Sequence, residues 1–183
     1  MPNHSAEPTH NGMRLCFCIA VLVIAISSQA SDHAQGPRDR ALAGAVQIAT
    51  AMKAQDAKAV ARLTLPDLVW AIGGEAKMIE ILQAKFERAK EVGIVKDTLD
   101  LGPPSALGVD GKTHYVFIPY VHLAQSPTRR VRDEAYFLAI SDDTGVTWHY
   151  VDGIQLTEAE IRRAFIPGYR GDPPAPKVSR NVD

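Results

Sequence analysis

The chain has 183 residues, of which 46% are hydrophobic and 22% charged, and its formal net charge at pH 7 is -1. This length and composition are ordinary for one globular domain. Because the 20 Lys and Arg residues are balanced by 21 Asp and Glu residues, the charge shows no basic excess of the kind that binds nucleic acid or an anionic membrane, and neither partner is expected.

The N-terminus predicts export. An uninterrupted apolar run extends from Leu15 to Ile26, with Arg14 before it and Ser-Ser-Gln-Ala after it, ending at Ala30. This is the pattern of a secretory signal peptide. A permanent membrane helix is the alternative, but the run is shorter than the roughly 20 residues that span a bilayer. We therefore expect a periplasmic or extracellular protein, with Met13 as an alternative start.

Cleavage after the apolar run defines the predicted organisation of the chain. Both cysteines, Cys16 and Cys18, would leave with the leader, so the mature protein would be held by its core without disulfides. The last segment contains Pro173, Pro174 and Pro176 and few apolar residues, which predicts disorder. The predicted parts are a signal peptide (1–30), a linker (31–37), a single α+β domain (38–166) and a Pro-rich disordered tail (167–183).

Helical periodicity fills the first half of the predicted domain. Apolar residues recur at three- and four-residue spacing, the period of an amphipathic helix. Proline stands in the first turn of the third segment, and glycines end the third and the fourth. The predicted helices are Arg38–Ala54, Ala57–Leu65, Pro66–Ile72 and Glu75–Val92.

After Gly93 the period changes from 3.6 to 2, which predicts strands. The two longest, Lys112–Leu123 and Arg129–Ser141, are expected to pair antiparallel across the loop between them. A shorter strand, Val95–Leu101, precedes them. A final helix, Leu156–Phe165, begins with the capping-box spacing of Thr157 and Glu160.

The stretch from Tyr136 to Gly153 predicts a β-hairpin. Its arms are rich in aromatic and β-branched residues, and its turn contains acids, Thr and Gly. The pattern Ser141-x-Asp143-x-Gly145-x-Thr147-Trp148 resembles the Asp-box hairpin of sialidases and many β-propellers. That resemblance implies an acid that braces the turn and a Trp that packs beneath it. Only one copy is present, whereas a propeller needs the unit repeated.

Helices followed by antiparallel strands predict an α+β fold, with the helices packed on one curved sheet and a short C-terminal helix. Residues 38–165 resemble the nuclear transport factor 2-like (cystatin-like) superfamily in the order of their elements and in the ending Trp148-x-Tyr150-x-Asp152-Gly153. In that family a curved sheet wraps a long helix and leaves a cone-shaped cavity, and its members include ketosteroid isomerases, scytalone dehydratase and secreted domains without known activity. The resemblance implies a fold and transfers no catalytic residue.

Asp133 is the candidate catalytic residue. Pairing the two long strands about residues 124–128 places Asp133 near Pro119 and on one face with apolar neighbours. A carboxyl in such surroundings has a raised pKa and can act as a general base. The simpler interpretation is an acid at the strand end that meets water or Arg132. The candidate ligand-binding side chains are Trp70, Tyr115, Phe117 and Phe137.

No metal site or cofactor is predicted. The opposite face would carry His114, Tyr120, His122, Arg130, Arg132 and Glu134. His114 and His122 would lie about 26 Å apart on one strand, too far to share an ion. His149 is expected on a neighbouring strand and could approach His114, but no third ligand is apparent to complete a zinc site.

Two functions follow from the sequence. The first is a non-catalytic module for small-molecule binding, with a small apolar ligand, or for association. The alternative is a cofactor-free lyase or isomerase that uses Asp133 as its base in an apolar cavity. A homodimer joined through an exposed face of the sheet is a third hypothesis.

Overall fold

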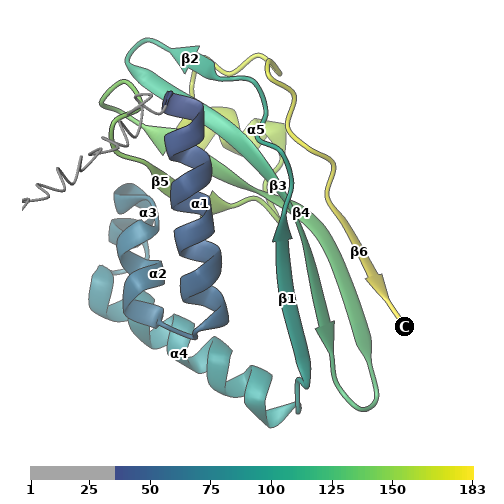
Figure 1. Cartoon of the computed structure of the whole chain (residues 1–183). Helices are drawn as coiled ribbons and strands as arrows, with labels where there is room; N and C mark the ends of the chain where they lie inside the picture. The colour runs from purple at the N-terminus through teal and green to yellow at the C-terminus, as the bar shows by residue number, and fades with distance from the viewer. Residues whose placement is uncertain (1–35) are drawn as a thin grey trace, which may run out of the picture. The chain divides into compact units, whose positions relative to one another are not determined.

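The computed structural model describes residues 36–183. The predicted signal peptide and the predicted linker up to residue 35 lie outside the described residues. Within the described part, the chain is α+β, as the sequence predicts: helices come first and pack against a curved antiparallel sheet (Figure 1).

Between residue 36 and the sheet there are four helices: α1 (Pro37–Lys53), α2 (Ala57–Leu63), α3 (Pro66–Ala71) and α4 (Glu75–Glu91). Local signals set their ends. The Asp56 carboxylate accepts a hydrogen bond from the Ala59 amide at 2.9 Å and caps α2. Gly93, at φ 66°, lies just beyond α4 in a conformation that favours glycine.

Six strands form one antiparallel sheet: β1 (Lys96–Leu101), β2 (Gly108–Asp110), β3 (Thr113–Gln125), β4 (Arg130–Ser141), β5 (His149–Asp152) and β6 (Ser179–Val182). Strands β3 and β4 are the long central pair. β1 and β2 pair with the edge of β3 that faces away from β4. β5 and β6 pair with the edge of β4 that faces away from β3.

The register of β3 and β4 differs from the predicted one. Pro119 lies opposite Tyr136, and Asp133 lies opposite His122, so the pairing is shifted by an odd number of residues. Because side chains alternate between the two faces, an odd shift exchanges the faces of one strand relative to the other. Asp133 therefore shares a face with Tyr120 and His122, which the predicted register put on the opposite face.

One face of the sheet, here called the inner face, packs against α1, α2 and α4. Its buried residues meet small side chains of α1, which let the helix approach closely. This core contains Ala41, Ala45, Ile48, Val60, Val116, Ile118, Tyr120, Ala135, Phe137, Ala139, Trp148 and Tyr150. The Tyr150 hydroxyl donates a hydrogen bond to the Ala41 carbonyl at 2.7 Å and ties β5 to α1.

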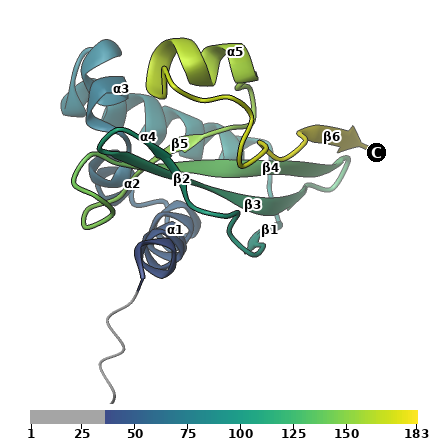
Figure 2. The same cartoon turned by 90° about the horizontal axis from the view of Figure 1, so that it is seen from above.

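The other face, here called the outer face, is covered by the C-terminal segment. α5 (Glu158–Glu160) and the π-helical turn η1 (Ile161–Phe165) lie on the side of the sheet opposite to α1 (Figure 2). Thr157 and Glu160 make the predicted capping box. The second core contains Leu65, Tyr115, Phe117, Tyr136, Leu138, Ile140, Val151, Ile161, Ile166 and Tyr169. The apolar part of this face is therefore not exposed, and a dimer through it, as the sequence suggested, would first have to displace this cover.

The segment from Pro167 onward is packed rather than disordered, which differs from the prediction. Tyr169 is fully buried, its hydroxyl donates to the Pro173 carbonyl at 3.1 Å, and it accepts from the Ala175 amide at 2.9 Å. The chain then returns to the sheet as β6 along β4. The tail is ordered because the apolar outer face has to be covered, which composition of the tail alone does not reveal.

Candidate functional site

The β4–β5 hairpin has the geometry that the Asp-box resemblance implies. The Asp143 carboxylate accepts hydrogen bonds from the Ser141 hydroxyl at 2.7 Å and from the Val146 and Thr147 amides at 3.0 and 2.8 Å. These bonds, led by that from Ser141, hold the pKa of Asp143 well below its usual range. The buried Trp148 ring donates to the Gly145 carbonyl at 3.1 Å. Both carboxylate oxygens of Asp143 accept hydrogen bonds from groups of its own turn, so the motif acts as a brace.

Asp133 is buried, at 2% exposure, and is paired. The Arg180 guanidinium of β6 binds both of its oxygens, Nε to Oδ1 at 2.6 Å and Nη2 to Oδ2 at 2.9 Å. The imidazole of His122 adds a longer contact, Nδ1 to Oδ2 at 3.5 Å, while its Nε2 lies 2.7 Å from the Asp97 carboxylate. Asp97, His122, Asp133 and Arg180 thus form a connected polar chain across β1, β3, β4 and β6.

The pKa of Asp133 is lowered, in the direction opposite to the one that the general-base hypothesis needs. The hydrogen bond from Arg180 is the largest cause, and it outweighs the desolvation that raises the pKa. A carboxylate that is stabilised in its ionised form is a weaker base. The pairing with Arg180 and the lowered pKa both disfavour Asp133 as a general base.

The four candidate ligand-binding aromatics do not form one site. Trp70 is 82% exposed on α3. Tyr115 and Phe117 lie on the outer face, where both rings contact Tyr169 edge-on. Phe137 lies on the inner face with Tyr120. Three of the four are therefore core residues, in two separate cores, and the fourth is on the surface.

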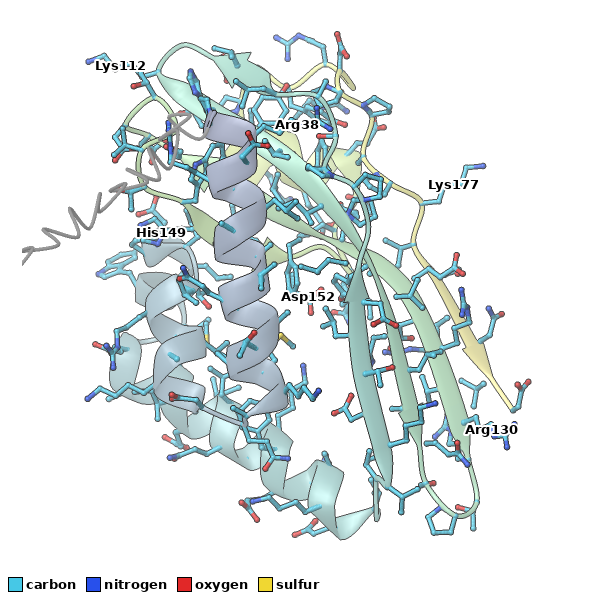
Figure 3. All side chains as sticks on the ribbon, in the orientation of Figure 1. Arg38, Lys112, Arg130, His149, Asp152 and Lys177 are labelled. Carbon is cyan, nitrogen blue, oxygen red and sulfur yellow. The ribbon has the colours of Figure 1, made fainter. Side chains whose placement is uncertain are left out.

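The sequence did not predict a second polar contact of the inner face. The Tyr120 hydroxyl donates to the Asp152 carboxylate at 2.7 Å, and Asp152 projects between α1 and the sheet in Figure 3. Burial, with the Asp152 charge as a further cause, raises the pKa of Tyr120 far above its usual range. The alternation of side chains along β3 does indicate that Tyr120 shares a face with His122, because the two residues are two positions apart.

The histidines do not assemble a metal site. His114 lies opposite Ser141 and His149 opposite Ile140, so these two side chains are on different faces of the sheet. Figure 3 shows His149 on the side of α3. Among residues 36–183, no three His, Cys, Asp or Glu side chains are grouped so that they can hold an ion.

Two of the hollows on the surface of the described chain are considered as ligand sites. One, of about 360 Å³, lies between α1 and β1, and it is lined by Val46, Ala49, Thr50, Lys53, Leu99, Asp100 and Leu101. The other, of about 240 Å³, lies at the far end of the sheet, and it is lined by Lys96, Leu123, Ala124, Gln125, Arg130, Val131, Arg132 and Asp183. Asp133 lines neither of them.

Comparison with known proteins gives no relative: no family model, no curated protein and no solved structure matches the chain. Of the helices between residues 36 and 183, none combines the length and the apolar character needed to cross a membrane.

Proposed function

We propose that the protein is an exported, non-catalytic binding module of the nuclear transport factor 2-like class, and that a small apolar molecule binds in the hollow between α1 and β1. The observation that carries the proposal is the composition of this hollow. Val46, Ala49, Leu99 and Leu101 supply an apolar lining, and Thr50 and Lys53 supply polar groups at its border. Small-molecule sites combine a mainly apolar wall with a few polar groups in this way.

The position of the hollow also supports binding, because the hollow lies beside α1 on the inner face of the sheet. Leu99 and Leu101 belong to β1 and lie opposite His122 and Tyr120, so their side chains project from the inner face. Both are only partly buried against the core. A ligand in the hollow would complete the burial of these side chains, at roughly 25 cal/mol for each Å² of apolar surface removed from water.

The class and the location of the protein rest on separate observations. The order of helices followed by a curved antiparallel meander supports the superfamily, and the apolar run from Leu15 to Ile26 followed by Ser-Ser-Gln-Ala supports export. Mass spectrometry of the protein recovered from its natural host tests export. We expect an N-terminus near residue 31, and recovery of the full leader from the cytosolic fraction would contradict it.

Titration with 1-anilinonaphthalene-8-sulfonate, an anionic fluorescent probe whose aromatic part binds apolar sites, tests the binding site. The Ala49→Phe substitution fills the hollow with an aromatic ring. The matched control is Ala84→Phe, which adds the same ring at an exposed position of α4. We expect the native chain and the Ala84→Phe variant to enhance the fluorescence of the probe equally and to lose the enhancement on unfolding, and we expect Ala49→Phe to weaken binding about tenfold or more.

Equal binding by both variants would show that the probe does not occupy this hollow. Failure of the folded native chain to bind any of a set of apolar probes would overturn the proposal itself. Circular dichroism of each variant distinguishes a filled hollow from an unfolded chain.

A further inference from the structure

Strand β1 is an edge of the sheet. It pairs with β3 on one side, and no strand among residues 36–183 pairs with its other side. Figure 2 shows β1 at the border of the sheet, with α1 on the inner side of the same border. An edge of six residues offers its outward N–H and C=O groups to another strand.

The outward groups can be identified from the pairing with β3. The Gly102 amide donates to the Pro119 carbonyl at 2.7 Å, directly across the ladder. Since such pairs alternate in an antiparallel ladder, the backbone groups of the even-numbered residues point to β3. The backbone groups of Asp97, Leu99 and Leu101 therefore point away from the sheet.

Two charges on this strand have no ion-pair partner. Lys96 and Asp100 are exposed, and neither makes a salt bridge with another described residue. They project from the same face of β1, but four residues separate them by roughly 13 Å, so they cannot reach each other within one chain. They stand symmetrically on either side of Thr98.

We infer that a second copy of this chain pairs antiparallel along β1, with the twofold axis at Thr98. This register places Lys96 opposite Asp100 of the partner subunit, and Asp100 opposite Lys96 of the partner subunit. Each ion pair therefore forms twice, as a twofold interface requires. Thr98 meets Thr98 of the partner subunit, a favourable cross-strand pair.

The same register uses the outward backbone groups and covers exposed apolar surface. Asp97 lies opposite Leu99 of the partner subunit, and Leu99 lies opposite Asp97 of the partner subunit. The outward N–H and C=O groups of one strand therefore meet those of the other. Val95, which is 72% exposed, lies near Leu101 of the partner subunit. A register centred on Leu99 also joins outward groups, but it puts Lys96 opposite Gly102 and leaves both charges unpaired.

The pairing goes beyond the proposed ligand site but adjoins it. The hollow is lined only by α1 and this edge strand, and Val46 on α1 is half exposed beside it. With a twofold axis perpendicular to the sheet, the second α1 lies on the same side of the joined sheet. The two hollows then face each other across the axis.

Exchanging the charges of Lys96 and Asp100 tests the pairing. The quantity measured is the dissociation constant of the dimer, and no ligand probe is needed. Sedimentation velocity over roughly 1 to 100 μM covers the range in which such interfaces dissociate. We expect a dimer of the native chain. Lys96→Glu and Asp100→Lys each turn two attractions into two repulsions and should raise the dissociation constant about tenfold or more. The double variant, Lys96→Glu with Asp100→Lys, restores both pairs and should restore the dimer.

A backbone test complements the charge test. Leu99→Pro removes an outward N–H, whereas Leu99→Ala shortens the side chain and keeps that N–H. We expect the alanine variant to dimerise and the proline variant to be monomeric. A monomeric native chain at the highest concentration, or single charge variants as dimeric as the native chain, would overturn the inference. Failure of the double variant to recover the dimer would overturn the register.

Discussion

Replacing Arg180 by alanine removes the guanidinium that binds Asp133, and the effect on folding can be worked out from the structure. The two hydrogen bonds measure 2.6 and 2.9 Å, and the Asp133 side chain is only 4% exposed. The variant leaves a buried carboxylate whose remaining side-chain contact is the 3.5 Å approach of His122. Leaving a buried charge without its partner is costly.

The magnitude lies between the values for surface and buried ion pairs. Exposed pairs contribute about 0–1 kcal/mol, and loss of one partner of a buried pair costs about 3–5 kcal/mol. Because the Arg180 side chain is 59% exposed, solvent screens one half of this pair. We expect Arg180→Ala to lower the free energy of unfolding by about 2 kcal/mol, which for a domain of this size lowers Tm by about 4–8 °C.

The direction in which the free energy of unfolding changes with pH follows from the pKa of Asp133. The pKa of Asp133 in the folded state lies below its ordinary value, so the folded state binds fewer protons there than the unfolded state. The stabilisation by Asp133 is therefore complete above the unfolded pKa and is lost as pH falls through the native pKa. We expect the difference in Tm between the native chain and Arg180→Ala to shrink as the pH is lowered from 7 towards about 3.

Thermal denaturation followed by circular dichroism measures these values, with Asp133→Asn as the control background. Arg180→Ala should cost much less in that background, because asparagine leaves no buried charge to satisfy. An unchanged Tm for Arg180→Ala at pH 7, or an equal loss with and without Asp133, would refute the reasoning.

Three further substitutions test the packing. Gly44→Ala would place a Cβ against the buried ring and hydroxyl of Tyr150, and denaturant titration should show a loss of about 1–3 kcal/mol. Tyr169→Ala should cost about 3–5 kcal/mol and make the C-terminal segment sensitive to limited proteolysis, whereas a protected tail would contradict its packing role. Asp143→Ala should lower Tm, because three hydrogen bonds of the hairpin turn lose their acceptor. An unchanged Tm would show that the turn does not need its brace.

The sequence predicted the elements well because each has a local cause. The spacing of apolar residues predicted the helices, and glycines beyond α3 and α4 predicted where these helices stop. The bracing role of Asp143 followed from short-range chemistry within the hairpin. Each of these signals is contained in a few consecutive residues.

The predicted register of β3 and β4 was wrong because both faces of these two strands are apolar. Tyr115 and Phe117 point to one core, and Val116 and Ile118 point to the other. A strand that is buried on both sides gives no alternation by which a one-sided register can be recognised. The predicted register placed Asp133 and His122 on opposite faces of the sheet. The polar chain that runs from Asp133 through His122 to Asp97 was therefore not predicted.

The continuous apolar run of β3 also held an unused signal about the tail. A strand buried on both faces needs two covering layers, and α1, α2 and α4 cover only one face. The segment from Leu156 to Tyr169 was the remaining apolar stretch in the predicted domain and tail. The pairing of Arg180 with Asp133 joins residues 47 positions apart and had no local signal.

Amide chemical-shift mapping by ¹⁵N–¹H NMR, with and without the fluorescent probe, tests the proposed binding surface most directly. We predict shifts concentrated in residues 46–53 of α1 and 99–101 of β1, and unchanged amides around Tyr115 and Phe117 under the C-terminal segment. Shifts concentrated at the outer face or at the far end of the sheet, with none along α1 and β1, would contradict the account.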